Sequence, residues 1–368
     1  MHNRNRLKLG LFGPNCSSGV IRTTVPERWT AEWHENVELA QLADAYGIDF
    51  LLPVGRWKGY GGTLDFEGTS FETISWAAPL LALTERLTIF GTVHTPLFDP
   101  VIAAKQMVTA DHAGRGRFGL NVVCGWNQDE FAMFGREQRD HTARYEHGQE
   151  WLDAVRMMWE CPDEFDFAGR FFQLQGVRAK PKPFGGSRPV IMNAGRSPEG
   201  QAFAMRNCDA FFTGLRTISF DESTGRLVPN VAEAAAQVAR VQEHAARLER
   251  EIAVFTRGEI VCRPTQAQAR EYFHYAFEEH ADWDGVDRQI FMQTGLTAGA
   301  PGFEAARTSH VRRFPIVGDP DAVAALLAQV SGAGFSGIAL GFINYLDELP
   351  YFCTEVLPRL ERLGLREP

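Results

Sequence analysis

The sequence of 368 residues predicts a (β/α)8 TIM barrel, and three observations support this fold class. Short and almost continuously apolar segments alternate with longer segments of helical periodicity along the chain. Such apolar strands are typical of a parallel sheet that is buried on both faces. About eight strand–helix pairs follow one another without a break in composition, which favours a closed barrel over an open doubly wound sheet.

The predicted strands share runs of branched and aromatic side chains that end at glycine, proline or polar residues. In chain order they cover residues 7–13, 48–54, 87–93, 117–123, 189–194, 209–214, 252–261 and 337–342. The predicted helices cover residues 31–46, 70–83, 99–112, 142–159, 198–206, 232–248, 265–280, 322–330 and 345–363. Gly47 ends the first helix, because glycine readily leaves the helical conformation.

No linker or low-complexity tract divides the chain, so we expect a single domain over residues 1–368. Two stretches do not fit the repeat and are predicted to be insertions. Residues 165–183, after the fourth strand, are expected to form a hairpin. Residues 282–313, before the last β/α unit, are polar and expected to be loop-like.

Composition and charge exclude several classes of protein. The apolar content of 45% excludes disorder, and 37 Lys+Arg against 46 Asp+Glu give a net charge of −9. That acidic balance argues against a nucleic acid or a membrane surface as partner. The six cysteines form no CxxC, and no HExxH occurs, so we predict neither disulfides nor a metal site. Without a signal peptide or a membrane-spanning run, we expect a cytoplasmic protein.

Chemistry in this fold is placed at the carboxyl ends of the strands, and NAGRSPEG at residues 193–200 is the most informative such segment. Gly195 lets the backbone approach a ligand, and Ser197 followed by Pro198 is a good helix start. A helix N-terminus presents free N–H groups and partial positive charge, which suit a phosphate, and Arg196 adds a cation. The alternative interpretation is an ordinary capped turn.

Two loops after predicted strands carry further candidates. In GRWKGYGG after the second strand, Arg56 and Trp57 could line the mouth over a flat ligand, or the glycines could form only a flexible turn. After the fourth strand, the amide of Asn121 could bond the edge of a heterocycle and Glu130 could accept from a ligand hydroxyl. Ordinary structural use is the alternative for both.

Three further candidates lie elsewhere in the chain. Arg144 and Tyr145 at the start of a long helix could close on a phosphate, or be a surface arginine and a core tyrosine. His94 ends the third strand and could donate to an oxygen or orient a substrate, with a core histidine as the alternative. Residues 312 and 313, both arginine, could bind an anionic substrate, or be part of a solvated loop.

A literal match to the dinucleotide fingerprint, GAGFSG at residues 332–337, is misleading. That fingerprint has to follow a strand and open a helix. Here the glycines follow a predicted helix and precede a predicted strand, so we interpret them as helix C-caps. The sequence therefore offers no nicotinamide-binding unit.

Taken together, the motifs resemble the bacterial luciferase-like superfamily of flavin monooxygenases, within it the dimethyl sulfone and pyrimidine monooxygenase branch. The resemblance spans nearly the whole chain, and several motifs in fixed order are more specific than any one. The segments that carry it are LKLGLFGPN, RWKGYGG, GRFGLNVVCGWNQDEF, RYEHGQEWL, FAGRFFQL, NAGRSPEG, VGDPDAVAALL, GFSGIALGF and EVLPRLE. Cys124 departs from the Ser or Thr that is usual in this branch before Gly-Trp.

The resemblance implies a barrel that binds FMN at its mouth and receives reduced flavin from a separate NAD(P)H:flavin reductase. Carried over by motif, Gly55 and Arg56 would meet the flavin, and Asn121 and Glu130 would flank its ring and ribityl chain. The phosphate would be held by residues of two segments, namely Arg144, Tyr145, Gly195 and Ser197. A homodimer or homotetramer would follow the habit of the family.

The expected function is oxidation of a small organosulfur (sulfone- or sulfonate-like) or heteroaromatic substrate, with O2 as co-substrate and cleavage of a C–S or C–N bond. Reduced flavin gives electrons to O2, and the protein must exclude water and stabilise the peroxide anion. For this we expect catalytic donors at His94 and Asn121, and substrate-binding walls at Trp57, Trp126 and Phe342.

Three other functions remain open at this point. A deazaflavin (F420)-dependent oxidoreductase would use the same barrel for hydride transfer and need no O2. A non-catalytic member would bind flavin without consuming oxygen. An enzyme of phosphorylated sugars on an unrelated barrel is disfavoured by the assembled motifs.

Overall fold

The structure is a computed structural model that describes residues 1–215, 218–221, 226–311 and 314–367. Eight parallel strands of this described part close a barrel, because β11 pairs with both β8 and β13 and so joins the two ends of the sheet. They are β1 (Lys8–Phe12), β2 (Phe50–Leu52), β3 (Thr88–His94), β4 (Phe118–Val123), β7 (Val190–Asn193), β8 (Ala210–Phe212), β11 (Ala253–Cys262) and β13 (Gly337–Gly341). The predicted (β/α)8 barrel is confirmed.

The interior of the barrel is filled by aromatic rings that lie against glycines. A side chain on Gly10 would meet the ring of Phe50 at 2.2 Å, and one on Gly119 would meet the ring of Phe90 at 2.6 Å. Both rings belong to a buried cluster separate from the core under the helices. The lower part of the barrel is therefore solid, and a ligand has room only above these rings.

The helices cover the outer face of the barrel and begin where capping residues place them. Asp99, for example, accepts from the backbone N–H groups of Val101 and Ile102 at the start of α3. The helices that follow the strands are α1 (Trp33–Ala45), α2 (Thr73–Ala82), α3 (Pro100–Ala113), α5 (His141–Glu160), α6 (Pro198–Asn207), α7 (Val231–Ala246), α8 (Gln266–His274), α11 (Pro320–Gly332) and α12 (Tyr345–Arg362). α8 continues as a π-helix over Tyr275–Glu279. Within the described residues, none of the helices combines the length and apolarity needed to cross a membrane.

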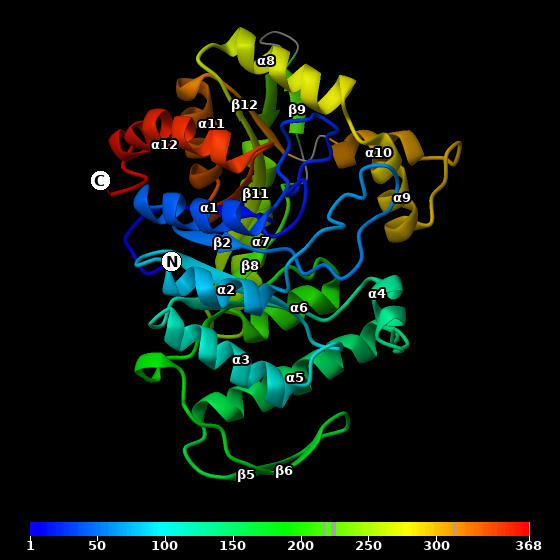
Figure 1. Ribbon diagram of the computed structural model, residues 1–368, viewed down its shortest axis with the longest axis vertical. Coiled ribbons are helices and arrows are strands. Elements are labelled where there is room, and N and C mark those ends of the chain that lie inside the picture. The colour runs from blue at the N-terminus through cyan, green and yellow to red at the C-terminus, as the bar shows by residue number, and fades with distance from the viewer. Residues whose placement is uncertain (216–217, 222–225, 312–313, 368) are drawn as a thin grey trace.

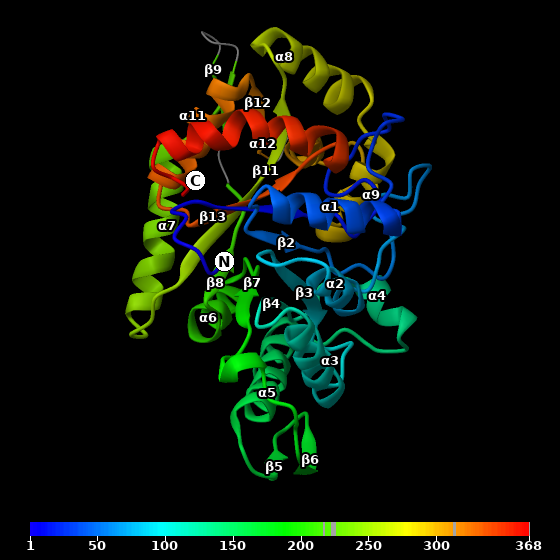
Figure 2. The same cartoon turned by 60° about the vertical axis from the view of Figure 1, so that its left-hand side comes forward.

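The prediction is confirmed for one of the two insertions and wrong for the other. β5 (Phe165–Ala168) and β6 (Gln173–Val177) form the expected antiparallel hairpin, which lies at the edge of the molecule in Figure 2. The expectation of a loop over 282–313 is wrong, because it contains α9 (Trp283–Thr294) and α10 (Phe303–Val311). The side chain of Asp282 caps α9, whose buried face includes Val286 and Ile290. Polar residues on the exposed faces hid this pattern.

Several short elements were not predicted. They are α4 (Gln128–Met133), η1 (Phe184–Gly186), β12 (Pro315–Gly318) and the hairpin of β9 (Ile218–Asp221) with β10 (Arg226–Pro229). β12 extends the sheet by pairing with the second half of β11. GAGFSG spans the end of α11 and the start of β13, which confirms that it is no dinucleotide fingerprint.

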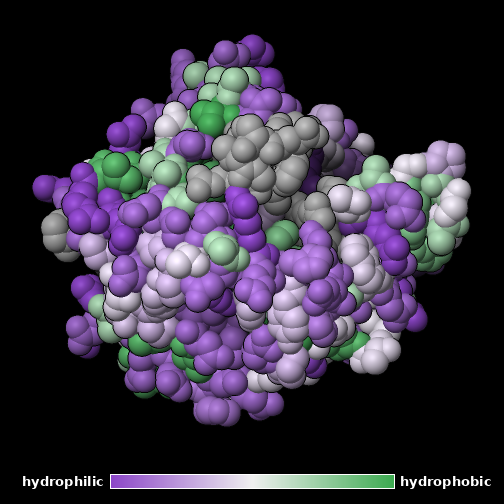
Figure 3. All heavy atoms as spheres, turned by 90° about the horizontal axis from the view of Figure 1, so that it is seen from above, coloured by the Kyte–Doolittle hydropathy of each residue, from purple (hydrophilic) through white to green (hydrophobic). Residues whose placement is uncertain are grey.

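The two ends of the barrel differ in what surrounds them. Figure 1 shows both termini on the left and α4, α9 and α10 on the right. Because the carboxyl ends of the strands point toward the second group, this end is the mouth. Figure 3 shows a largely hydrophilic surface, with paler residues on the projecting segment at the right, where Figure 1 places α9 and α10.

Candidate active site

Asn121 lies at the mouth with half of its amide unused. Its Nδ2 donates to Thr92 Oγ1 at 3.1 Å, and this hydroxyl donates to the carbonyl oxygen of Pro53 at 2.6 Å. Asn121 Oδ1 is buried and has no hydrogen-bond partner among the described residues. Because a buried polar atom without a partner is costly, this oxygen is suited to a ligand that brings an N–H or O–H.

Arg56 is held by a buried network rather than left free for an anion. Its Nε lies 2.7 Å from Glu67 Oε2, its Nη1 lies 3.2 Å from Glu130 Oε1, and its Nη2 donates to the hydroxyl of Tyr60 at 3.0 Å. Burial alone would lower the pKa of Arg56, but Glu67, Tyr60 and Glu130 outweigh it and raise the pKa. The guanidinium lies 5.5 Å from the ring centroid of Trp126. Each nitrogen of the Arg56 guanidinium therefore already has a partner in the protein.

Glu130 joins this network to His94. Its Oε1 also accepts from the backbone N–H of Trp57 at 2.9 Å, and its Oε2 lies 3.7 Å from His94 Nδ1. Burial lowers the pKa of His94 to about 4, against the opposing effect of Glu130, and Arg56 lowers it further. His94 is thus neutral near pH 7. A methyl group on Gly55 would lie 3.4 Å from His94 Nε2, so Gly55 lies beside this ring.

The residues expected to hold a phosphate are brought together from α5 and α6. Ser197 is the N-cap of α6 and accepts from the backbone N–H of Gly200 at 3.1 Å, while the hydroxyl of Tyr145 bonds to Ser197. A side chain on Gly195 would lie 2.7 Å from the Cα of Gly200 and 2.9 Å from the Tyr145 hydroxyl. Only glycine fits this close approach.

Arg144 lies at the same end, one residue before Tyr145. Its Nη1 donates to the backbone carbonyl of Gly125 at 2.6 Å, whereas its buried Nε has no partner in the described part of the chain. Cys124 is buried near Arg144, and burial raises the pKa of its thiol to about 12. The thiol is therefore neutral and leaves the charge of Arg144 for an anion.

The three aromatic residues expected as substrate walls have different positions. Trp57 packs edge-on against Phe134, with ring centroids 5.0 Å apart, and Trp126 lies over Arg56, so both are near the mouth. Phe342 does not reach the mouth. Its ring packs against Phe352 of α12 at 5.6 Å. The pleat directs Phe342 outward with Leu340 rather than inward with Ala339, which corrects the expectation.

Two arginines at the mouth were missed by the sequence analysis. Arg257 lies on the inward face of β11, two residues after Phe255, and burial lowers its pKa to about 10 against the effect of Glu259. Arg22 is 4% exposed and its guanidinium lies 4.6 Å from the ring centroid of Phe66. An arginine inside the apolar strand AVFTRGEIVC was the available signal. Residues 312 and 313 lie outside the described residues.

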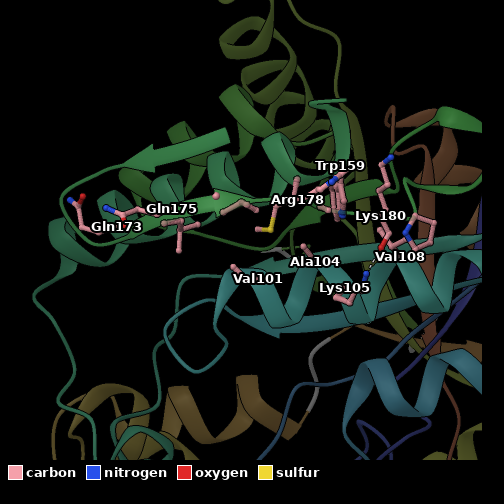
Figure 4. A pocket seen from close by; sticks show the side chains of 15 residues that line it. Val101, Ala104, Lys105, Val108, Trp159, Gln173, Gln175, Arg178 and Lys180 are labelled. Atoms are coloured by element: carbon pink, nitrogen blue, oxygen red, sulfur yellow. Dashed lines mark hydrogen bonds between the residues drawn. The ribbon is translucent and has the colours of Figure 1, made fainter. Parts of the chain in front are cut away.

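Two grooves lie outside this constellation. One of about 470 Å³ runs between α3, α5 and the β5–β6 hairpin, and Figure 4 shows Val101, Lys105, Trp159 and Gln173 along it. No residue predicted for the site lines it. A second groove, of about 750 Å³, lies between the loop after β2 and α9. Of the residues bonded to Arg56, Tyr60 lines this groove, whereas Glu67 and Glu130 do not.

Fold and geometry together define a (β/α)8-barrel protein with a cluster of buried polar side chains at the carboxyl ends of its strands. Residues 7–337 match the model of the luciferase-like monooxygenase family, and the chain belongs to this family.

Relatives of known function match over almost the full length. The chain is 27% identical to the FMNH2-dependent dimethylsulfone monooxygenase of Pseudomonas fluorescens (strain Pf0-1), over 98% of this chain and 96% of the relative. It is 28% identical to the pyrimidine monooxygenase RutA of Methylorubrum populi, over 97% of this chain and 93% of the relative. The crystal structure of riboflavin lyase RcaE shares the fold with a TM-score of 0.86 and 22% identity, over 98% of this chain and 92% of that one.

Proposed function

We propose that this chain is a two-component monooxygenase that uses reduced FMN and O2 to oxidise a small organosulfur (sulfone- or sulfonate-like) or heteroaromatic compound with cleavage of a C–S or C–N bond. Membership of the luciferase-like monooxygenase family supports the reaction type, and the dimethylsulfone and pyrimidine monooxygenases among the relatives support the substrate classes.

The observation that carries the proposal is the cradle formed by Gly195, Ser197 and Tyr145 at the start of α6. Gly195 lets the backbone pack closely against Gly200 and the hydroxyl of Tyr145, where a side chain would clash, and the free N–H groups of a helix N-terminus suit a phosphate. The unpartnered Nε of Arg144 adds a cation, and the unpartnered Oδ1 of Asn121 suits the edge of a heterocycle. The residues present therefore fit FMN.

In this proposal each group of residues has one task. Arg144, Tyr145, Gly195 and Ser197 hold the phosphate, and Gly55 and Asn121 meet the ring. Reduced FMN, when bound, supplies the two electrons that O2 needs to oxygenate a substrate. Trp57 and Trp126 exclude water from the mouth, and His94, neutral near pH 7, holds or moves a proton there.

The chain needs a source of reduced FMN, and we propose a separate NAD(P)H:flavin reductase as its partner. We further propose a cytoplasmic homodimer or homotetramer with a small-molecule substrate. A separate reductase is consistent with the position of GAGFSG in this chain. The motif lies between the end of α11 and the start of β13, where it does not form a nicotinamide site.

The test is an anaerobic titration with reduced FMN, followed by mixing with air-saturated buffer in a stopped-flow spectrometer. We expect saturable binding and an oxygen-dependent absorbance transient that decays faster when the right sulfone, sulfonate or pyrimidine is present. Binding of F420 with no response to O2 would favour the deazaflavin oxidoreductase. FMN binding without substrate-dependent oxygen consumption would favour a non-catalytic flavin binder.

A further inference from the structure

Glu130 lies at the meeting point of three elements of the mouth. It comes from α4, is 1% exposed, and contacts both the loop after β2 and the end of β3. Through Oε1 it holds the Arg56 guanidinium and the Trp57 backbone N–H, and through Oε2 it faces His94. Oε1 is therefore occupied by the protein, and Oε2 is directed to the histidine. A direct contact of the ribityl chain with Oε1, as expected from the sequence for Glu130, would have to displace Arg56 or Trp57.

The ion pair with Arg56 does not by itself explain why this carboxylate is buried. Arg56 already has a closer partner in Glu67, at 2.7 Å against 3.2 Å for Glu130. Burying the carboxylate of Glu130 costs desolvation energy that an apolar side chain would avoid. Glu130 Oε2 lies beside His94 at the mouth, so the buried negative charge can act on this histidine.

The two ring nitrogens of His94 have different surroundings. Nδ1 lies 3.7 Å from Glu130 Oε2, longer than a formed hydrogen bond but close enough for the carboxylate to favour a proton on Nδ1. Nε2 lies on the side of Gly55, in the loop after β2. In a neutral ring one nitrogen carries the proton and the other a lone pair, so the neighbour of Nδ1 decides what Nε2 offers.

We propose that Glu130 is a positioning residue that keeps His94 in the tautomer with the proton on Nδ1, so that Nε2 presents a lone pair to the bound ligand as a hydrogen-bond and proton acceptor. A proton accepted from the ligand bonds to Nε2 and leaves its electron pair on the ligand. The positive charge then formed on the ring is balanced by Glu130. This assignment makes His94 an acceptor rather than the donor that the sequence suggested, and its use in turnover rests on the proposed function.

Arg56 and Trp57 extend the same positioning role. Since one carboxylate oxygen holds both, α4 and the loop after β2 are fixed relative to each other. Tyr60 extends this arrangement further, because its hydroxyl accepts from both Arg56 Nη2 and Gln289 Nε2 of α9. The orientation of His94 is thus set by a network that reaches three elements around the mouth.

The tautomer can be measured in the ligand-free protein by NMR with ring-labelled histidine, using H94Q to assign the signal of His94. We expect the Nδ1–H tautomer in the wild type. In E130Q the amide oxygen can still accept from Arg56 and Trp57, whereas the amide NH2 donates to Nδ1 and switches His94 to the Nε2–H tautomer. D129N is the matched control, because Asp129 precedes Glu130 on α4 but forms an exposed pair with Lys58. It should leave the signal unchanged.

An Nε2–H tautomer in the wild type, or no switch in folded E130Q, would overturn the proposal. If E130Q does not fold, the wild-type assignment decides the matter alone. With an active substrate in hand, E130Q should lower kcat by about 10- to 100-fold with KM nearly unchanged, an effect of the size known for residues that orient metal-bound histidines. If the tautomers behave as expected but no substrate responds to O2, only the proposed function fails.

Discussion

The lower and upper halves of the barrel differ in how their buried side chains are paired, although the same strands form both halves. On β3, Phe90 is fully buried against Gly119, whereas His94, four residues later, lies in a polar network. The lower half contains apolar rings packed against glycines, while the upper half holds buried groups such as Asn121 Oδ1 and Arg144 Nε without partners. A buried polar atom without a partner costs free energy, and we propose that the upper half is the functional one.

The largest effect should come from breaking the lower half. Phe50→Ala removes a ring that is 0% exposed, and we expect a loss of about 3–5 kcal/mol in the free energy of unfolding, because the close neighbour Gly10 cannot fill the cavity. Urea unfolding followed by circular dichroism measures it. The variant that remains folded should bind reduced FMN with an unchanged Kd. A large change in Kd with little change in stability would contradict the division between the halves.

The upper half should respond in the opposite way. In the double variant Arg144→Ala, Ser197→Ala, flavin binding should weaken by about 2–4 kcal/mol, because charge-assisted contacts to the phosphate are lost. Titration monitored by flavin fluorescence gives this value. Riboflavin, which lacks the phosphate, is the matched ligand control and should lose little. An unchanged Kd for FMN in the double variant would refute the phosphate site.

The pH dependence of stability should also report on the upper half. The pKa of His94 is lowered from 6.5 to about 4, so the unfolded chain binds more protons between these values. Stability is therefore expected to fall as the pH is lowered from 6.5 toward 4, by about 3 kcal/mol at most from this residue. Chemical unfolding across this range, compared between the wild type and H94Q, isolates the contribution. A wild-type curve parallel to that of H94Q would show that His94 titrates normally.

The smallest expected effect comes from replacing Asn121, and it distinguishes the two halves of the barrel most clearly. Asn121→Leu keeps the branched shape of the side chain and removes the unpartnered oxygen, so we expect the protein to gain about 1 kcal/mol in stability and to bind FMN more weakly. Thermal unfolding together with the FMN titration tests both parts. Phe90→Leu, in the lower half of β3, is the control and should only destabilise. A loss of stability in Asn121→Leu would mean that this amide serves the fold.

Much of this architecture could be predicted from local patterns. All eight barrel strands appear where apolar runs predicted them, because burial on both faces leaves an unmistakable run of apolar residues. Ser197 caps α6 and the hairpin near 165–183 forms, since caps and hairpins are decided by neighbouring residues. The α9–α10 segment was missed, because its helices bury only narrow faces.

The sequence by itself determined the alternation of strands and helices, the capped start of α6 and the family of the chain, because each depends on residue order over short distances or on motifs in series. The tertiary structure decided which side chains face the same space. It turned Phe342 outward, brought Arg257 and Arg22 to the mouth, and placed Glu130 between Arg56 and His94. The physical reason is that side-chain direction follows the pleat of each strand. Residues 36 positions apart in sequence, such as His94 and Glu130, meet only because β3 pairs with β4.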